Sequence, residues 1–153
     1  MRKSHKIAAG LAAVAMLAAV PATANAMSGA EKLRRLDIML MVTGLRCRTT
    51  ADNFQADYGR FTTRHIGELN LAAAQLRGEM ARRFGAAGAE RALDRLSVTM
   101  ANDYGQGHPW LSCHELKMVA ANLVDAQGAD TLEAAADQLL ASNGSGQLAM
   151  SRR

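Results

Sequence analysis

Apolar residues recur at intervals of three and four along most of the chain, which is the period of one face of an α-helix. The first such segment is predicted to start at a capping box of Ser28 and Glu31 and to run to about Arg48. Residues 38–42 are apolar on all sides, so we expect this helix to be central and covered by its neighbours. Its stripe consists of Leu33, Leu36, Leu40 and Leu45.

A second, long helix is predicted to begin at a cap formed by Thr50 or Asp52 and to end at Gly85. Glycine inside a helix costs about 1 kcal/mol relative to alanine, so we expect a kink or break near Gly67. The residues of its apolar stripe are Phe54, Tyr58, Phe61, His65, Leu69, Leu76, Met80 and Phe84.

A third helix is predicted from about Gly88 to Tyr104. Residues 96–100 alternate between apolar and polar types, as a strand does, but the stretch is short and lies within a helical pattern. We therefore assign it to the helix. Residues 105–110 contain two glycines and a proline and are predicted to form a loop.

The last two predicted helices both follow capping boxes. Ser112 and Glu115 form the box of a fourth helix, which Gly128 is expected to end. A third box at residues 130 and 133 predicts a short fifth helix that runs to about Ala141.

These segments predict a single-domain, all-α bundle of about five helices over residues 27–142, followed by a flexible tail at residues 143–153. Aromatic residues make up only 4% of the chain, so the core is expected to consist mainly of leucine, methionine, alanine and valine.

The segment before the first helix has the three parts of a secretory signal peptide. Arg2, Lys3 and Lys6 form a basic start, residues 7–20 carry no charge, and residues 24–26 form a small-x-small cleavage site. A transmembrane anchor is the alternative, but the apolar run is shorter than the roughly 18–20 residues that span a bilayer. We predict cleavage after Ala26 and a periplasmic or secreted protein without a membrane anchor.

Removal of this segment changes the charge of the protein. It takes three of the 18 basic residues and none of the 14 acidic ones, so the remaining 127 residues carry a net charge near +1. Nucleic-acid binding requires several clustered basic residues, so the sequence indicates no nucleic-acid partner.

Cys47 and Cys113 are the only cysteines, and an exported protein enters an oxidising compartment. We predict a disulfide between them that joins the end of the first helix to the start of the fourth. The alternative is a redox-active or metal-binding thiolate, since a helix N-terminus lowers the pKa of a cysteine. The absence of a C-x-x-C motif argues against an oxidoreductase.

The predicted disulfide would gather several polar residues into one candidate ligand-binding or partner-binding site. Two arginines facing the start of the fourth helix could bind an anion. The alternative is structural: Trp110 would close the end of the bundle, and the charged residues would lie in solvent or pair with Glu115. The candidate residues are Arg46, Arg48, His108, Trp110 and His114.

Other motifs are incomplete. His114 and Met118 share a helix face, but a copper or haem site needs more converging ligands, so we predict neither a metal nor a cofactor. His65 lies on an apolar stripe and is expected to be a hydrogen-bonded core residue. The sequence contains no complete dinucleotide fingerprint, Walker A, G-x-S-x-G or H-E-x-x-H motif, and therefore no catalytic set.

Three stretches carry a resemblance to a known family: LDIMLMV at residues 36–42, LRCR at 45–48, and YGQGHPWL at 104–111 with Cys113. They resemble a family of small exported helical bacterial proteins whose activity is not established, over nearly the whole exported chain. Some members carry the name adenosylhomocysteine hydrolase. That enzyme is large, cytosolic and NAD-dependent, and this chain lacks its parallel-sheet pattern and glycine fingerprint. The resemblance implies no site residues.

We expect a non-enzymatic helical protein that binds another protein or a small anionic ligand. One alternative is a small hydrolase or lyase with His108 or His114 as general base, which requires a pocket that holds the histidine beside a carboxylate or nucleophile. The other is a protein similar to periplasmic acid-stress chaperones, which are also small, helical and closed by one disulfide; that likeness is architectural only.

Overall fold

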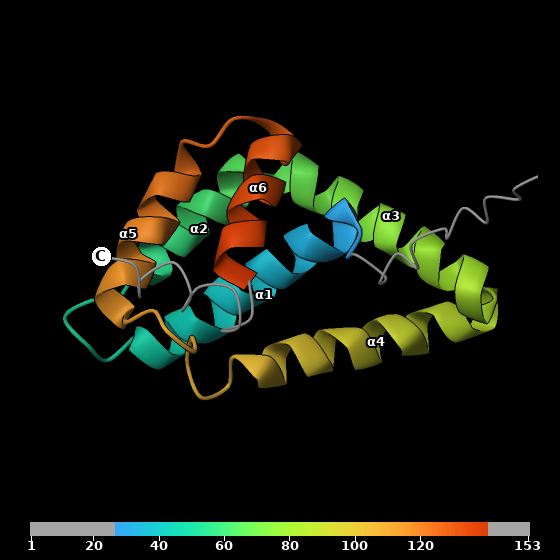
Figure 1. Ribbon diagram of the computed structural model, residues 1–153, viewed down its shortest axis with the longest axis horizontal. Coiled ribbons are helices and arrows are strands. Elements are labelled where there is room, and N and C mark those ends of the chain that lie inside the picture. Colours follow the sequence, from blue (N-terminus) through green and yellow to red (C-terminus); the bar gives the residue numbers. More distant parts are fainter. Residues whose placement is uncertain (1–26, 141–153) are drawn as a thin grey trace, which may run out of the picture.

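The computed structural model describes residues 27–140, which form six α-helices and no strand (Figure 1). The predictions of a signal peptide at residues 1–26 and a tail at 143–153 lie outside the described residues. The all-α fold is confirmed, with one helix more than expected. The helices are α1 (Gly29–Cys47), α2 (Gln55–Arg64), α3 (Ile66–Phe84), α4 (Ala86–Asp103), α5 (Cys113–Val124) and α6 (Gly128–Leu140).

Helix α1 is the centre of the fold and contacts each of the other five helices. Ile38, Met39 and Leu40 are buried, as the apolar run predicted. The expectation that this run is covered on all sides is wrong at Met41, which is exposed. Leu45, one turn further along the helix, is exposed on the same side. Ser28 is the N-cap of the helix, and its hydroxyl accepts a hydrogen bond from the Glu31 amide at 3.2 Å.

The predicted long second helix is two helices, and the expected break near Gly67 is confirmed: it lies at His65, two residues before the glycine. The buried His65 ring donates from Nε2 to the Leu123 carbonyl of α5 at 2.7 Å. The bond joins the bend to α5, and on either side of the bend α2 packs on α5 while α3 packs on α1 and α4.

The predicted cap of α2 is also wrong. Thr50 and Asp52 lie in the preceding turn, and α2 begins at Gln55, whose amide donates to the Asn53 side chain at 3.0 Å. Phe54 stands at the cap position without a side-chain hydrogen bond to the helix.

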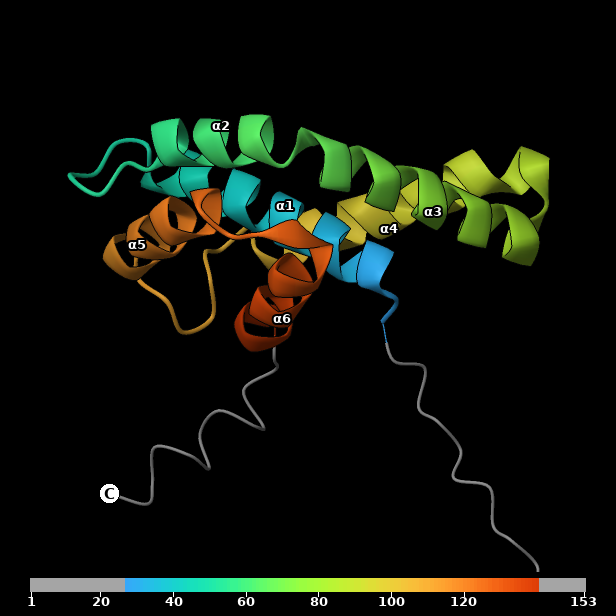
Figure 2. The ribbon, with the colours of Figure 1, turned by 90° about the horizontal axis from the view of Figure 1, so that it is seen from above.

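Helices α3 and α4 form a hairpin that packs against α1 and whose turn end projects beyond the other helices (Figure 2). Gly85 separates them with a φ of +72°, a conformation that glycine adopts without strain, so the predicted end of α3 is confirmed. Residues 96–100 are helical, as predicted.

Ser112 and Glu115 form the predicted capping box at the start of α5. The Glu115 carboxylate accepts from the Ser112 amide at 2.8 Å, and the Ser112 hydroxyl accepts from the Glu115 amide at 3.3 Å. The box predicted at Asp130 is wrong, because α6 already begins at Gly128 and Asp130 lies in its first turn. Gly128 therefore starts α6 and does not end α5.

The disulfide between Cys47 and Cys113 is present, with their Cα atoms 5.7 Å apart. It joins the last residue of α1 to the first residue of α5, as predicted. All buried core residues of the described chain lie between Ala30 and Ala136. Within residues 27–140, no helix combines the length and apolar character that crossing a membrane requires.

Candidate functional site

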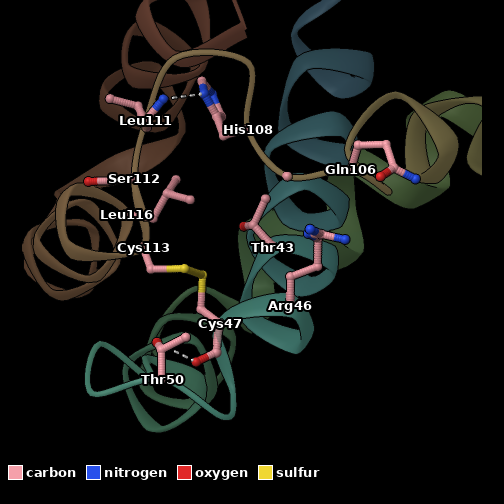
Figure 3. A pocket seen from close by; sticks show the side chains of 11 residues that line it. Thr43, Arg46, Cys47, Thr50, Gln106, His108, Leu111, Ser112, Cys113 and Leu116 are labelled. Atoms are coloured by element: carbon pink, nitrogen blue, oxygen red, sulfur yellow. Dashed lines mark hydrogen bonds between the residues drawn. A yellow bond between two sulfur atoms is a disulfide. The ribbon is translucent and has the colours of Figure 1, made fainter.

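A cavity of about 350 Å³ lies at the disulfide end of α1 (Figure 3). The last turns of α1, the loop between α4 and α5, and the start of α5 form its walls. Arg46 and Gln106 lie on one side, and Ser112 and Leu116 lie on the other. The lining residues are Thr43, Arg46, Cys47, Thr50, Gln106, Gly107, His108, Leu111, Ser112, Cys113 and Leu116.

Arg46 supplies the positive charge of this cavity from the last turn of α1. Its Nη1 donates to the Gly105 carbonyl at 3.0 Å, which holds the guanidinium against the loop. A guanidinium has five N–H donors, so this one bond leaves others for a ligand. The side chain as a whole is exposed, so a ligand can reach it from solvent.

His108 also lines the cavity, but the backbone occupies both of its ring nitrogens. Nδ1 accepts from the amides of Leu111 at 3.2 Å and Trp110 at 3.4 Å, so the proton resides on Nε2. Nε2 donates to the Leu139 carbonyl of α6 at 3.0 Å. Burial lowers the pKa of His108 below its usual 6.5, which favours this neutral form. The ring therefore ties the loop to α6.

Three of the five predicted site residues do not line the cavity. Trp110 is 40% exposed and stands edge-on to the His108 ring, with the ring centroids 4.5 Å apart. Arg48 lies in solvent at the end of α1. His114 is exposed on α5, where its Nδ1 lies 3.2 Å from Asp52 Oδ1. Of the five residues, only Arg46 and His108 line the cavity, and Trp110 packs against His108 outside it.

The start of α5 is not a free anion site. The Ser112 hydroxyl caps the Glu115 amide, and the Glu115 carboxylate accepts from the Ser112 amide, so a negative group of this chain already lies there. The backbone and side-chain hydrogen bonds from Ser112 lower the pKa of the Glu115 carboxyl, so this carboxylate itself stands at the positive end of the helix. An anion in the cavity has to be held by Arg46 instead.

A second polar group, which no motif in the sequence indicated, lies between α1 and the α2–α3 pair. Asp37, Tyr58 and Arg34 line a cleft of about 220 Å³ there. Tyr58 Oη donates to Asp37 Oδ1 at 2.9 Å, and Arg34 Nη1 lies 3.5 Å from Asp37 Oδ2. Desolvation raises the pKa of both Asp37 and Tyr58. The signal available in the sequence was one acidic residue, Asp37, beside the apolar run of α1.

Comparison of the chain with protein-family models, curated proteins and solved structures found no match. The resemblance to a family of small exported proteins therefore stays a prediction. Among residues 27–140, no three His, Cys, Asp or Glu side chains converge as a metal site would require. The function has to be inferred from the geometry of the cavity.

Proposed function

We propose that this chain is an exported, non-enzymatic binding protein whose cavity at the disulfide takes a small organic anion. The observation that carries the proposal is the charge of the cavity wall. Of the described residues that line it, Arg46 carries a full positive charge and none is acidic, while His108 is held neutral by its contacts. A carboxylate or phosphate on the ligand would bind the guanidinium through charge-assisted hydrogen bonds.

The rest of the lining indicates the size and polarity of the ligand. A volume of about 350 Å³ lies at the small end of the range for ligand pockets. The hydroxyls of Thr43 and Thr50 already donate to backbone carbonyls of α1. Leu111, Leu116 and the disulfide supply apolar surface. These features favour a small acid with a short apolar body.

The rival proposal of a hydrolase or lyase has less support. A general base needs a nitrogen within hydrogen-bond reach of the substrate proton. Both nitrogens of His108 are occupied by backbone groups. His114 has a carboxylate partner in Asp52, but the pair lies on the exposed surface outside the cavity. The acid-stress chaperone alternative rests on architecture alone.

Export is part of the proposal. A disulfide forms and persists in oxidising compartments, so the bond between Cys47 and Cys113 supports a periplasmic or secreted location. This agrees with the signal peptide expected at residues 1–26, with Met27 as the new N-terminus.

The test is a titration of the chain from Met27 onward with small monocarboxylates and inorganic phosphate, followed by amide NMR. We expect shifts at residues 105–111 and at the Trp110 indole. Arg46→Gln should weaken binding about tenfold or more, because a hydrogen bond to a charged group contributes about 1.5–3 kcal/mol. Arg46→Lys should retain part of the affinity.

Arg48→Gln is the matched control. It removes the same charge two residues away, from a side chain that does not line the cavity. We expect it to bind like the wild type. Equal weakening in Arg46→Gln and Arg48→Gln, or no anion-dependent shift near the cavity, would contradict the proposal.

A further inference from the structure

The projecting hairpin of α3 and α4 carries a second surface that the cavity does not involve. An open groove of about 220 Å³ lies between the last turn of α3 and the facing part of α4. Its lining residues are Met80, Arg83, Phe84, Ala92, Arg95, Leu96 and Thr99.

The groove combines an apolar base with an aromatic ring that reaches into solvent. Met80 and Ala92 are buried beneath it. Phe84 is the last residue of α3, and it is 50% exposed. A Cβ at Gly88 would lie 3.1 Å from the Phe84 Cβ, so the helices approach closely here. Glycine at position 88 leaves room for Phe84, about half of which remains open to a partner.

The charge of the groove is of one sign. Arg83 and Arg95 are its only ionisable lining residues among those the structure describes, and both are exposed. Within residues 27–140, no carboxylate lies within 4.0 Å of either guanidinium, whereas Arg77 nearby pairs with Glu90 at 2.7 Å. The Arg83 guanidinium lies 5.4 Å from the centre of the Phe84 ring. Apolar surface edged by unpaired cations is complementary to anionic amphiphiles.

We propose that the end of this hairpin docks on an anionic phospholipid bilayer. Phe84 enters the boundary between headgroups and acyl chains, and Arg83 and Arg95 bind lipid phosphates. The position of the groove favours a bilayer over a single dissolved lipid. The groove is open and includes the last residue of α3, and the turn that follows projects beyond the other helices (Figures 1 and 2).

The test is co-sedimentation of the chain from Met27 onward, which retains the whole core, with lipid vesicles. We expect binding to mixed phosphatidylglycerol–phosphatidylcholine vesicles, little binding to pure phosphatidylcholine, and weaker binding as salt rises. Each arginine near an anionic surface contributes a factor of about five, so Arg83→Gln with Arg95→Gln should weaken binding roughly 25-fold. Phe84→Ser should also weaken it.

Matched controls use residues far from the hairpin end. Arg48→Gln with Arg64→Gln removes two other exposed arginines, and Met118→Ser removes another exposed apolar side chain. Both controls should bind like the wild type. Circular dichroism checks that every variant keeps its helices.

A second readout reports the contact directly. In a Trp110→Phe background, Phe84→Trp should shift its emission to the blue when anionic vesicles are added. The native Trp110, the only tryptophan of the chain, should not shift. Equal binding by hairpin and control variants, no binding to anionic vesicles, or the same shift with a dissolved short-chain phosphatidylglycerol would each overturn the proposal.

Discussion

Tyr58 of α2 donates its phenolic hydrogen to the Asp37 carboxylate of α1 across 2.9 Å, and so links two helices through a half-buried polar pair. Desolvation raises the pKa of Asp37, while the Tyr58 hydrogen bond and the charge of Arg34 oppose that rise. The net direction is upward, so the folded protein holds a proton on this carboxyl more tightly than an unfolded chain does.

Replacement of Asp37 by asparagine should therefore make the protein relatively more stable as pH rises. The stability from a raised pKa is fully present below the ordinary value of 3.8 and is lost as pH rises through the folded value. Asparagine cannot ionise but still accepts from Tyr58. In urea unfolding from about pH 3 to pH 7, the free energy of unfolding of Asp37→Asn should rise relative to that of the wild type as the pH increases. A constant difference across the window would refute the assignment, and the exposed Asp94→Asn serves as control.

Replacement of Tyr58 by phenylalanine should destabilise the fold by about 1–2 kcal/mol, because it removes the donor from a carboxylate shielded from water. The loss should be larger at high pH than in acid, because the hydrogen bond to an ionised carboxylate is stronger than that to a protonated one. Urea unfolding at the two pH values measures it. A loss of the same size in an Asp37→Ala background would mean that the hydroxyl acts through some other contact.

Acid should loosen the loop between α4 and α5 through His108. A base whose pKa is lowered by folding contributes stability that is present above its ordinary value, here 6.5, and is lost as pH falls through the lower folded value. Protonated Nδ1 would then face two amide donors, those of Trp110 and Leu111. Trp110 fluorescence should report the change below pH 6.5. His114→Gln should leave it intact, and its persistence in His108→Gln would exclude this origin.

Loss of the disulfide should lower the free energy of unfolding by up to about 4 kcal/mol, the chain-entropy value for a 67-residue loop. Paired substitution of Cys47 and Cys113 by serine, with urea unfolding, measures the loss. Much of the helix signal should survive, because the apolar stripes remain. Trp110 should respond at lower urea than the far-ultraviolet signal, since its loop is tethered by Cys113. Coincident transitions would show that the loop is no weaker than the bundle.

The parts of the fold that depend on local sequence could be predicted. The stripes of α1 and α4, the box at Ser112 and the end of α3 at Gly85 all depend on residues within a few positions of one another. The break near Gly67 was also predicted, but its exact position and its contact could not be, because His65 bonds to Leu123, which lies 58 residues away. The pair of Asp37 and Tyr58 is hidden for the same reason.

The position of the candidate site could be predicted, but not which residues line it. The cysteines located it, since a disulfide brings the end of one helix to the start of another. Successive residues of a helix turn by about 100°, so Arg46 and Arg48 point in different directions and only Arg46 lines the cavity. His108 was correctly singled out as a cavity residue. Its hydrogen bonds to α6 and to its own loop give it a structural role and leave neither ring nitrogen free to act as a base.

The bond between Cys47 and Cys113 also gives the protein an unusual covalent topology. It closes residues 47–113 into a ring that contains all of α2, α3 and α4, with the remainder of the chain attached as two arms. A protease that cuts the chain once within this ring, for instance at the hairpin turn near Gly85, leaves two pieces that the disulfide still joins into one molecule. The two pieces separate only when the sulfur bridge is reduced, so the outermost turn can be nicked without dividing the protein.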